Sequence, residues 1–423
     1  MRFQLQARTG HPDFLDLPWQ QRLEDWDHHR LVTVPTGLHR HVVRTVRYGE
    51  RNYFLKALPP RLADREWRFL RHLKQEEVPV VDVVGVVRGR HDPDGDELPS
   101  ILITRQLEYA LPYRLLFVRE DAERLRDPML DALVDLLVRI HLVGFHWGDC
   151  SLSNTLFRRD AHRLAAYLVD TETGELHTSG LTDGQRGHDI DLAVERIAGE
   201  LYDLMASEVL PPEVDVPLLA EDLRTRYEAL WEELTTDEVF GEEERYRIHE
   251  RLARINELGY DVDEVEIVGD HDAGYRLRLR TSVLEPGRHT RRLKELTGVE
   301  AQENQARSLL NDIASFGAWL RETEGVPYSD EYVAHRWLEM SFQGVLDRVP
   351  EDARGKRDPA QVFHEALRYW WKRCGVEDRD LDFHETAQEY VDTVLRSVPD
   401  ERTVEVVSER EAQVLEDGPV TEL

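Results

Sequence analysis

The amino-acid sequence predicts an α+β protein of two lobes, a small lobe with an antiparallel sheet and a large helical lobe, followed by a mostly helical C-terminal domain with a small hairpin. Three observations support this prediction. Before residue 110, β-rich runs surround one helical segment; apolar residues then recur at helical spacing to about residue 210; and the rest of the sequence is helix-rich and acidic. With 423 residues, the chain is also longer than one compact core usually holds.

The changes in pattern along the chain divide it into five segments. We expect a helical N-terminal extension (1–30), the small lobe (31–110), the large lobe (111–210), the acidic C-terminal domain (211–398) and a disordered acidic tail (399–423).

Short β-rich runs and amphipathic segments predict the elements up to the end of the small lobe. In chain order we expect a helix over Pro18–Arg30, strands over Leu31–Pro35, His39–Tyr48 and Arg51–Leu58, a helix over Leu62–Lys74, and strands over Val80–Val87 and Ser100–Thr104. The aspartate-rich segment His91–Glu97 lacks the later bidentate acid of a calcium-binding loop. A plain hairpin turn is therefore expected there.

Helical spacing dominates the remaining sequence. The wide apolar face of Asp127–Val143 predicts a buried helix, and a second helix is expected over Asp189–Leu204. Further helices are predicted over 216–234, 242–257, 300–323, 330–347, 359–373 and 384–397. One hairpin, formed by Val265–Val268 and Tyr275–Thr281, interrupts this helical region.

Charge and composition narrow the classes of partner. The formal net charge of −30 repels nucleic-acid backbones and anionic lipid surfaces. No apolar run approaches the roughly 20 residues of a membrane-spanning helix, and the first residues lack the apolar block of a secretory signal. The two cysteines, Cys150 and Cys374, lie far apart, which suits a reducing compartment. We expect a cytoplasmic protein with no nucleic-acid partner and no transmembrane segment.

A segment in the middle of the chain carries the strongest functional signal. It contains Trp147-Gly148-Asp149, then Asn154, an apolar hairpin and finally Asp170. An aspartate at 149 can accept the proton of a substrate hydroxyl, while an amide oxygen five residues on and a second carboxylate can hold Mg²⁺ on nucleotide phosphates. We predict Asp149 as the catalytic proton acceptor and Asn154 and Asp170 as metal ligands. The alternative is that Asp149 only caps a turn after a buried helix.

A lysine and a glutamate upstream strengthen this interpretation. Lys56 lies in the predicted strand Arg51–Leu58, and Glu66 follows ten residues later in the predicted helix Leu62–Lys74. In phosphotransferases of this geometry a strand lysine contacts the nucleotide phosphates and is held by a carboxylate of the next helix. Alone, such a lysine would more often be solvated. Placed before the Asp149 segment, Lys56 and Glu66 are predicted nucleotide-binding residues.

These residues give the chain a family resemblance. Residues 31 to about 207 resemble the protein-kinase-like superfamily, nearer its lipopolysaccharide-kinase, small-molecule and RIO-like branches, because Trp147-Gly148-Asp149 is similar to a His-Gly-Asp rather than a His-Arg-Asp catalytic loop. The whole chain resembles uncharacterised actinobacterial proteins that join such a region to a C-terminal domain of unknown function. The resemblance implies a two-lobed protein-kinase-like fold that uses ATP and Mg²⁺, with Gly37 in the phosphate-covering loop.

Three features depart from the protein-kinase pattern. The phosphate-covering loop offers only Thr36-Gly37, and Asp170 is followed by Thr171-Glu172-Thr173 instead of Phe-Gly. No Ala-Pro-Glu signature follows, which leaves little room for a peptide-binding activation segment. Small molecules are therefore expected as substrates ahead of proteins.

The resulting hypothesis is an ATP- and Mg²⁺-dependent phosphotransferase acting on a hydroxyl of a small-molecule, sugar or glycolipid acceptor. Two alternatives remain open. One is a nucleotide-binding pseudokinase whose acidic C-terminal domain recruits a protein partner; the other is a transferase of the nucleotidyl (AMP) group, because a rotated nucleotide can use the same acids.

Several other residues are expected to have structural rather than catalytic roles. Trp147 is expected to pack, Cys150 to fill space, and either Asp189 or Asp191 to brace the catalytic loop, without a sequence reason to choose between them. In the C-terminal domain the basic run Arg288–Lys294 could bind a phosphate or carboxylate, but the favoured expectation is a solvated helix face neutralised by glutamates. Three tryptophans, Trp337, Trp370 and Trp371, are expected to fill the core.

Overall fold

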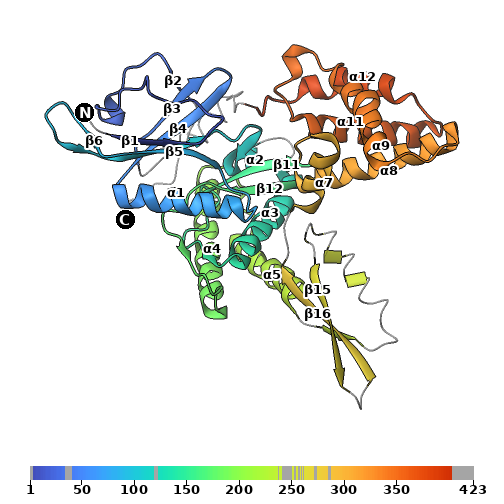
Figure 1. Cartoon of the computed structure of the whole chain (residues 1–423), viewed down its shortest axis with the longest axis horizontal. Coiled ribbons are helices and arrows are strands. Elements are labelled where there is room, and N and C mark those ends of the chain that lie inside the picture. Colours follow the sequence, from blue (N-terminus) through green and yellow to red (C-terminus); the bar gives the residue numbers. More distant parts are fainter. Residues whose placement is uncertain are drawn as a thin grey trace. The chain divides into compact units, whose positions relative to one another are not determined.

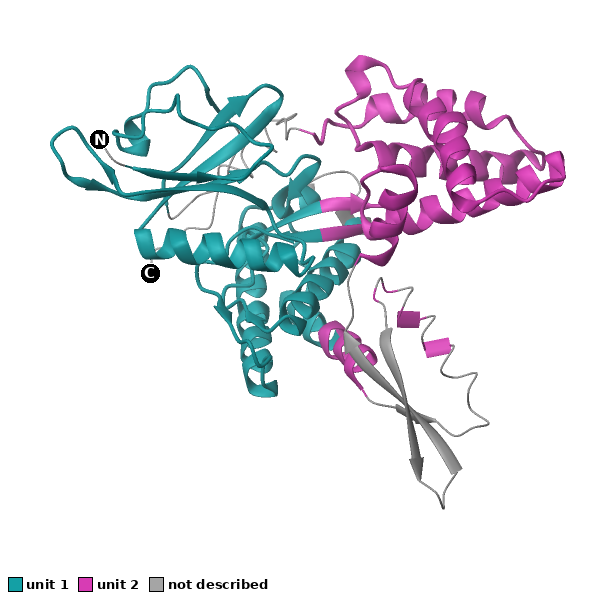
Figure 2. Ribbon diagram, in the orientation of Figure 1, with its two compact units in different colours: residues 1–157, 166–225, 406–423 teal, residues 158–165, 226–405 magenta. Residues whose placement is uncertain are grey.

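The computed structural model divides the chain into two compact units, coloured separately in Figure 2. The structure describes residues 3–33, 41–118, 122–236, 238–240, 250, 251, 254, 255, 258, 260, 262–270, 274–283 and 287–402. Among them, unit 1 comprises residues 3–157 and 166–225, and unit 2 comprises residues 158–165 and those after 225. No described helix combines the length and apolar composition of a membrane span.

The small lobe of unit 1 is built on a six-stranded antiparallel sheet, drawn in blue in Figure 1. Its strand order is β1-β5-β8-β4-β3-β2. The bounds are β1 Gln4–Ala7, β2 Leu31–Val32, β3 Val43–Tyr48, β4 Arg51–Leu58, β5 Asp82–Arg88 and β8 Ser100–Arg105. A further short hairpin, β6 Arg90–His91 and β7 Glu97–Leu98, carries the aspartate-rich turn. Asp92 Oδ1 accepts hydrogen bonds from the amides of Asp94 and Asp96, so the predicted plain turn is confirmed.

Helix α1, Pro60–Gln75, packs on this sheet (Figure 1) and begins with proline at its first position, where a missing amide costs nothing. It buries the face that carries Glu66, Trp67, Leu70 and Leu73, as its apolar spacing predicts. The predicted strand over Arg51–Leu58 and the helix over Leu62–Lys74 are both confirmed, which fixes the segments that carry Lys56 and Glu66.

The predicted helix over Pro18–Arg30 is wrong, and so is the helical character of the N-terminal extension. Residues 4–7 form an edge strand, and the only helical turn in the described part of this extension is the 3-10 turn Leu23–Asp25. Its apolar side chains are nevertheless buried, because the irregular chain lays Phe14, Trp19 and Trp26 against Val46 and Tyr53 of the sheet. Their spacing imitates an amphipathic helix but reflects packing on a sheet face.

The large lobe continues in unit 1 with the helices and short strands that frame the central segment. They are β9 Ala110–Pro112, α2 Tyr113–Val118, α3 Ala122–Leu142, β10 Phe145–His146, β11 Thr155–Asp160, β12 Arg163–Leu168, β13 Glu175–Leu176, α4 Asp183–Ala206 and α5 Val216–Thr235, of which residues 158–165 and 226–235 belong to unit 2. Helix α4 begins six residues before its predicted start, at a capping box between Thr182 and Gln185. The apolar hairpin expected between Asn154 and Asp170 is formed by β11 and β12.

Unit 2 contains a helical bundle and a three-stranded sheet. Its described elements are β14 Glu238–Phe240, β15 Val262–Asp270, β16 Gly274–Val283, α7 Arg288–Thr297, α8 Glu303–Glu324, α9 Asp330–Trp337, a π-helical turn Leu338–Phe342, α10 Gln343–Leu346, α11 Pro359–Glu377 and α12 Phe383–Thr393. The predicted hairpin and the helices beginning near 300, 330, 359 and 384 are confirmed. Most of the predicted helix 242–257, and the tail beyond residue 402, lie outside the described residues.

The core of the helical bundle forms around Trp337, Phe363 and Tyr390. The prediction for Trp337 is confirmed, but Trp371 is 66% exposed and does not belong to this core. The basic run Arg288–Lys294 opens α7, where Arg292 pairs with Asp330 and Lys294 with Glu300, so the expected neutralised helix face is confirmed for these two side chains.

The tip of the β11–β12 hairpin, residues 158–165, belongs to unit 2 and caps one of its helices. Asp160 is 3% exposed and accepts hydrogen bonds from the amide and side chain of Asn304 at 3.1 and 2.7 Å and from the amide of Gln305 at 2.7 Å. Both amides lie in the first turn of α8, whose donors have no partner within the helix. Asp160 therefore caps the N-terminus of α8, although it comes from a distant part of the sequence.

We expect Asp160→Ala to lower the free energy of unfolding of unit 2 by about 2–3 kcal/mol, because it leaves buried amides without acceptors. Urea unfolding followed by circular dichroism measures this change. The matched control is Asp392→Ala, which removes a half-exposed pair with Arg396 and a solvent-exposed hydrogen bond from Gln388 Nε2, and should change the value by less than about 0.5 kcal/mol. Equal effects of the two substitutions would show that Asp160 does not cap α8.

Candidate functional site

Lys56 joins two carboxylates that come from separate parts of unit 1. The lysine lies on β4, and its Nζ donates to Glu66 Oε1 of α1 at 3.0 Å and to Asp170 Oδ2 at 2.6 Å. Asp170 follows β12, so three elements meet at one ammonium group. Burial would lower the pKa of Lys56, but the charges of Glu66 and Asp170 outweigh it and raise that pKa. The raised pKa keeps the Lys56 ammonium group charged, and this group donates its shorter hydrogen bond to Asp170.

A third carboxylate completes the cluster. Glu172 Oε2 lies 3.9 Å from Lys56 Nζ and 2.9 Å from His41 Nε2, while the Glu172 amide donates to Asp170 Oδ1 at 2.8 Å. Glu66, Asp170 and Glu172 can each offer an oxygen, and these oxygens lie within 4.8 Å of one another. Three carboxylates around a single lysine carry surplus negative charge, and oxygen donors of this kind suit Mg²⁺. The residues present therefore fit a divalent cation.

Glu66 is more deeply buried than the other two acids of the cluster, Asp170 and Glu172. Its side chain is 2% exposed, and burial, together with the charge of Asp170, raises the pKa of Glu66 well above its ordinary value. For Asp170, burial acts in the same direction, but hydrogen bonding with Glu66 and the charge of Lys56 lower its pKa overall. Asp170 is thus the acid of the two whose pKa favours the ionised form, which a metal ligand requires, and Glu66 is suited to holding the lysine.

Asp149 lies in the loop between β10 and β11, where Gly148 allows the chain to turn. Gly148 has a φ of +73°, a left-handed conformation that glycine adopts without strain. The two oxygens of Asp149 are held separately: Arg196 Nε of α4 lies 2.8 Å from Oδ1, and Asn154 Nδ2 donates to Oδ2 at 3.1 Å. Because the amide nitrogen of Asn154 faces Asp149, its amide oxygen is left as an acceptor.

Electrostatics connect Asp149 with the Lys56 cluster. Burial raises the pKa of Asp149, and the charges of Asp170 and Glu172 act in the same direction against Arg196 and Asn154, which lower it. Hydrogen bonds place the Asp149 loop beside Asp170, because the Val169 amide donates to the Asn154 carbonyl at 3.1 Å and Trp147 Nε1 donates to the Asp170 carbonyl at 3.0 Å. The structure thus brings Lys56, Glu66, Asp149, Asn154 and Asp170 together. Gly37 lies outside the described residues.

Two buried carboxylates of α4 hold the catalytic loop. Asp189, fully buried, accepts hydrogen bonds from the amides of Trp147 and Gly148 at 2.7 and 2.8 Å and lies 3.0 Å from His141 Nε2. Glu200 accepts from the amides of Leu152 and Ser153 at 2.7 and 2.9 Å. Such amides would otherwise be buried without partners. The loop that carries Asp149 is therefore fixed on both sides of the aspartate.

This geometry answers the choice that the sequence left open. Asp189 is the bracing residue, whereas Asp191 is exposed and pairs with Arg224. Arg196, Glu172 and Glu200 were not predicted. Asp189, Arg196 and Glu200 recur at intervals of seven and four, which places them on one face of α4, and this spacing could have identified all three.

We expect Asp189→Ala to destabilise unit 1 by about 3–5 kcal/mol, because it leaves His141 and two buried amides without their acceptor. Asp191→Ala is the matched control, two residues away on the same helix, and should change stability by about 0.5 kcal/mol or less. Thermal unfolding of both variants measures the difference. A mild effect of Asp189→Ala would contradict the bracing role.

Trp147 and Cys150 behave as expected of packing residues. Both side chains are fully buried, and burial raises the pKa of the Cys150 thiol well above its ordinary value, which disfavours the reactive thiolate. Trp147 adds a link that packing alone would not supply, since its indole Nε1 donates to the carbonyl of Asp170 at 3.0 Å. The loop that carries Asp149 and the segment that carries Asp170 are thus joined directly.

Comparisons with known proteins agree with this geometry. Residues 32–193 match the lipopolysaccharide kinase (Kdo/WaaP) family, and residues 229–395 match a domain of unknown function, DUF4032. No curated protein matches the chain.

Two solved structures show distant likeness. "WaaP in complex with acyl carrier protein" is 19% identical, with 46% of this chain and 89% of that chain covered and a TM-score of 0.30. An aminoglycoside-3'-phosphotransferase of type VIII is 17% identical, with 48% and 86% covered and a TM-score of 0.31. Both scores are low, and we draw no conclusion from them.

The family matches confirm the resemblance found in the sequence, and the antiparallel sheet lobe with its helical continuation confirms the predicted fold class. The match over residues 32–193 and the arrangement of Lys56, Glu66 and Asp170 support a kinase-like phosphotransferase. The chain joins a region, residues 32–193, that matches the lipopolysaccharide kinase (Kdo/WaaP) family to a region, residues 229–395, that matches a domain of unknown function, DUF4032.

Proposed function

We propose that the chain transfers the γ-phosphoryl group of ATP, in the presence of Mg²⁺, to a hydroxyl of a small-molecule, sugar or glycolipid acceptor. The observation that carries the proposal is the pair of contacts made by Lys56, to Glu66 on α1 and to Asp170 after β12, beside Asp149. Phosphoryl transfer depends mainly on positioning and on stabilising charge, and this cluster provides for both.

Asp149 has the role of proton acceptor in this proposal. The acceptor oxygen forms a bond to the γ-phosphorus, the bond from that phosphorus to the ADP oxygen breaks, and the hydroxyl proton passes to the Asp149 carboxylate. Arg196 and Asn154 each engage one Asp149 oxygen, which orients the carboxylate, and Asp189 fixes the loop behind it. The raised pKa of Asp149 makes it a stronger base than an exposed aspartate.

Lys56, Asn154 and Asp170 bind the nucleotide and its metal in this proposal. Asp170 and the amide oxygen of Asn154 would hold Mg²⁺, which neutralises charge on the phosphates when bound. Lys56 would contact the phosphates and keep its hydrogen bond to Glu66, which holds the ammonium group in position. Gly37 is proposed to lie over the phosphates. Glu172, beside Asp170, is a further candidate for the metal or for orienting Lys56.

The short path from Asp170 to α4 supports a small or lipid-linked acceptor over a protein. Only residues 171–182 separate Asp170 from α4, and within them β13 is paired with β10. Little chain remains to bind a peptide. The family name of the region at 32–193 supports acceptors of the glycolipid class.

Mass spectrometry of products, after incubation with Mg²⁺-ATP and a panel of sugar, glycolipid and small-molecule hydroxyls, tests the proposal. We expect one acceptor to gain one phosphate, with one ADP formed for each phosphate transferred. An acceptor that gains AMP would support nucleotidyl transfer instead. A thermal shift with Mg²⁺-ATP but no ADP formation across the panel would support a pseudokinase with a protein partner.

A further inference from the structure

A cavity of about 400 Å³ lies between helices α8 and α11 of unit 2 and contains none of the residues of the Lys56 and Asp149 site. Helix α8 contributes Ser308, Asn311, Asp312 and Ser315 to its lining, and α11 contributes His364, Leu367, Arg368 and Trp371. On each helix these positions follow helical spacing, so they form one face. Two packed helices normally fill such faces with apolar side chains, but here α8 contributes polar ones. The volume is in the range of small-molecule sites.

Asp312 is an unpaired acid in this cavity. Its Oδ2 accepts a hydrogen bond from the buried Trp337 Nε1 at 2.7 Å, and no described cation pairs with the carboxylate. Burial raises the pKa of Asp312, and the hydrogen bond from Trp337 offsets this only in part. A sheltered carboxylate without a counter-charge costs free energy, so such a group is usually paired or bound to a ligand.

Trp371 presents an aromatic face next to this acid. Its side chain is 66% exposed, an unusual state for a tryptophan, and no described arginine or lysine lies over its ring. Trp370 contacts it edge to face, with 6.2 Å between centroids, and Trp370 is itself anchored by a hydrogen bond from Nε1 to the Leu381 carbonyl. The Trp371 ring thus has an anchored aromatic neighbour. The face of an indole attracts cations.

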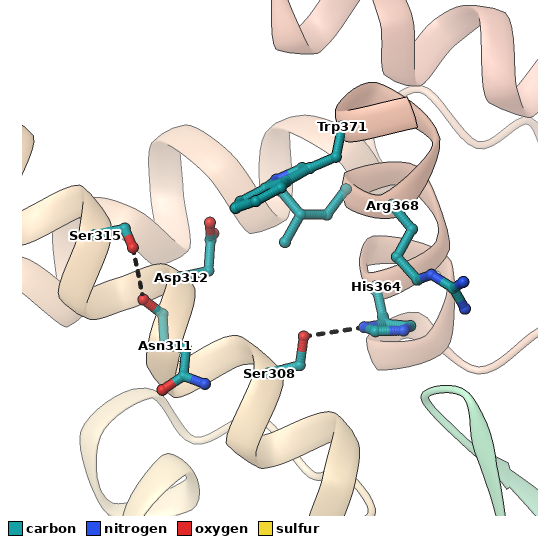
Figure 3. A pocket seen from close by; sticks show the side chains of 8 residues that line it. Ser308, Asn311, Asp312, Ser315, His364, Arg368 and Trp371 are labelled. Carbon is teal, nitrogen blue, oxygen red and sulfur yellow. Dashed lines mark hydrogen bonds between the residues drawn. The ribbon is translucent and has the colours of Figure 1, made fainter. Parts of the chain in front are cut away.

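Besides Asp312 and Trp371, the cavity is lined by hydroxyl, amide and imidazole groups and by one basic residue, Arg368. Figure 3 shows the Asp312 carboxylate and the Trp371 ring on one side of the cavity and Ser308 with His364 on the other. Ser308 Oγ and His364 Nδ1 lie 3.0 Å apart, and burial lowers the pKa of His364 to about 4, which keeps it neutral at pH 7. The Arg368 guanidinium lies beyond His364, away from Asp312 (Figure 3).

We propose that this cavity binds a small organic cation, with its positively charged nitrogen between the Asp312 carboxylate and the Trp371 ring. Ser308 and Asn311 then offer hydrogen bonds to polar groups of the same ligand. The site is separate from the Lys56 cluster in unit 1, so it stands whether or not the chain transfers phosphate.

Isothermal titration calorimetry of the full chain, without nucleotide, tests the proposal with choline and with its neutral isostere 3,3-dimethylbutan-1-ol. Spermidine and argininamide serve as further cationic probes. We expect at least one cation to bind, with the neutral alcohol about tenfold or more weaker than choline where choline is the binder. Binding by the cation should weaken about tenfold or more in Asp312→Asn and in Trp371→Leu.

Matched control substitutions show whether a loss of binding comes from this cavity or from the loss of any acid or any tryptophan of the chain. Glu322→Gln and Trp319→Leu remove an exposed acid and a half-exposed indole of α8 that do not line the cavity, and should leave the affinity unchanged. Because Trp371 is exposed, its replacement keeps the fold, and Asp312→Asn retains an acceptor for Trp337. No binding by any of the three cations, equal binding of choline and its isostere, or equal losses in the controls would each overturn the proposal.

Discussion

Changing Asp149 to asparagine lowers the rate of phosphoryl transfer by about 10²-fold or more, while folding and nucleotide affinity stay near those of the parent chain. The substitution keeps the size of the side chain and one oxygen for Arg196 or Asn154 to engage, but it removes the negative charge that accepts the acceptor's proton. Turnover under saturating Mg²⁺-ATP, with calorimetry of nucleotide binding alongside, measures both parts of this expectation.

The matched control for Asp149→Asn is Asp191→Asn, an exposed aspartate whose partner is Arg224 of α5. It should leave turnover within about twofold of the parent rate, since surface pairs contribute little. The pH profile adds a second check. Because the pKa of Asp149 is raised, its activity as a base should fall at a higher pH on acidification than an ordinary aspartate would give. Unchanged turnover in Asp149→Asn would rule out its role as proton acceptor.

Changing Asp170 to alanine should weaken the binding of Mg²⁺-nucleotide by about tenfold or more and reduce turnover at least as strongly. Asp170 is the ionised acid of the cluster and the closest partner of Lys56, so its loss removes a metal ligand and releases one restraint on the lysine. Glu66 and Glu172 remain near Lys56, and the fold should therefore persist. Titration calorimetry with Mg²⁺ and a nonhydrolysable ATP analogue measures the affinity.

The control for Asp170→Ala is Glu175→Ala, an exposed acid five residues later in the same stretch of chain. It should not change nucleotide affinity by more than about twofold. An Asp170→Ala variant that binds Mg²⁺-nucleotide as tightly as the parent would contradict the assignment of Asp170 as a metal ligand, and would point to Glu66 and Glu172 as the metal-binding acids.

Local patterns predicted the small lobe well where each element is stabilised by its own neighbours. The alternation in Arg51–Leu58 and the apolar spacing in Leu62–Lys74 reflect faces that are buried in the structure. The prediction for the N-terminal segment was wrong because its aromatic residues are buried on a sheet face by an irregular chain. The spacing of these residues in the sequence is the same as in an amphipathic helix, so periodicity cannot distinguish the two.

The site was predictable in part, because its central residues occur in a recognisable order along the chain. Lys56, Glu66, Asp149, Asn154 and Asp170 were named from spacing, and the structure brings them together. The supporting contacts depend on tertiary structure. The sequence could not decide between Asp189 and Asp191, which lie two positions apart, because only the docking of α4 shows which carboxylate reaches the catalytic loop.

A similar limit applies to unit 2. The capping of α8 by Asp160 joins residues more than 140 positions apart, and no local pattern signals it. Trp371 was expected in the core because it lies in an amphipathic helix beside Trp370, yet it is exposed at a cavity. The exposure of an aromatic residue depends on the neighbouring helix. Here that helix is α8, whose polar side chains do not pack against Trp371 as an apolar core would, so a cavity remains.

A crystal structure of the chain with Mg²⁺ and a nonhydrolysable ATP analogue tests the central claim most directly. The account predicts a triphosphate beside Lys56, a metal ion held by Asp170 and the amide oxygen of Asn154, and the γ-phosphate within reach of a hydroxyl placed at Asp149. A nucleotide bound elsewhere in the chain, or a metal ion that contacts neither Asn154 nor Asp170, would contradict it.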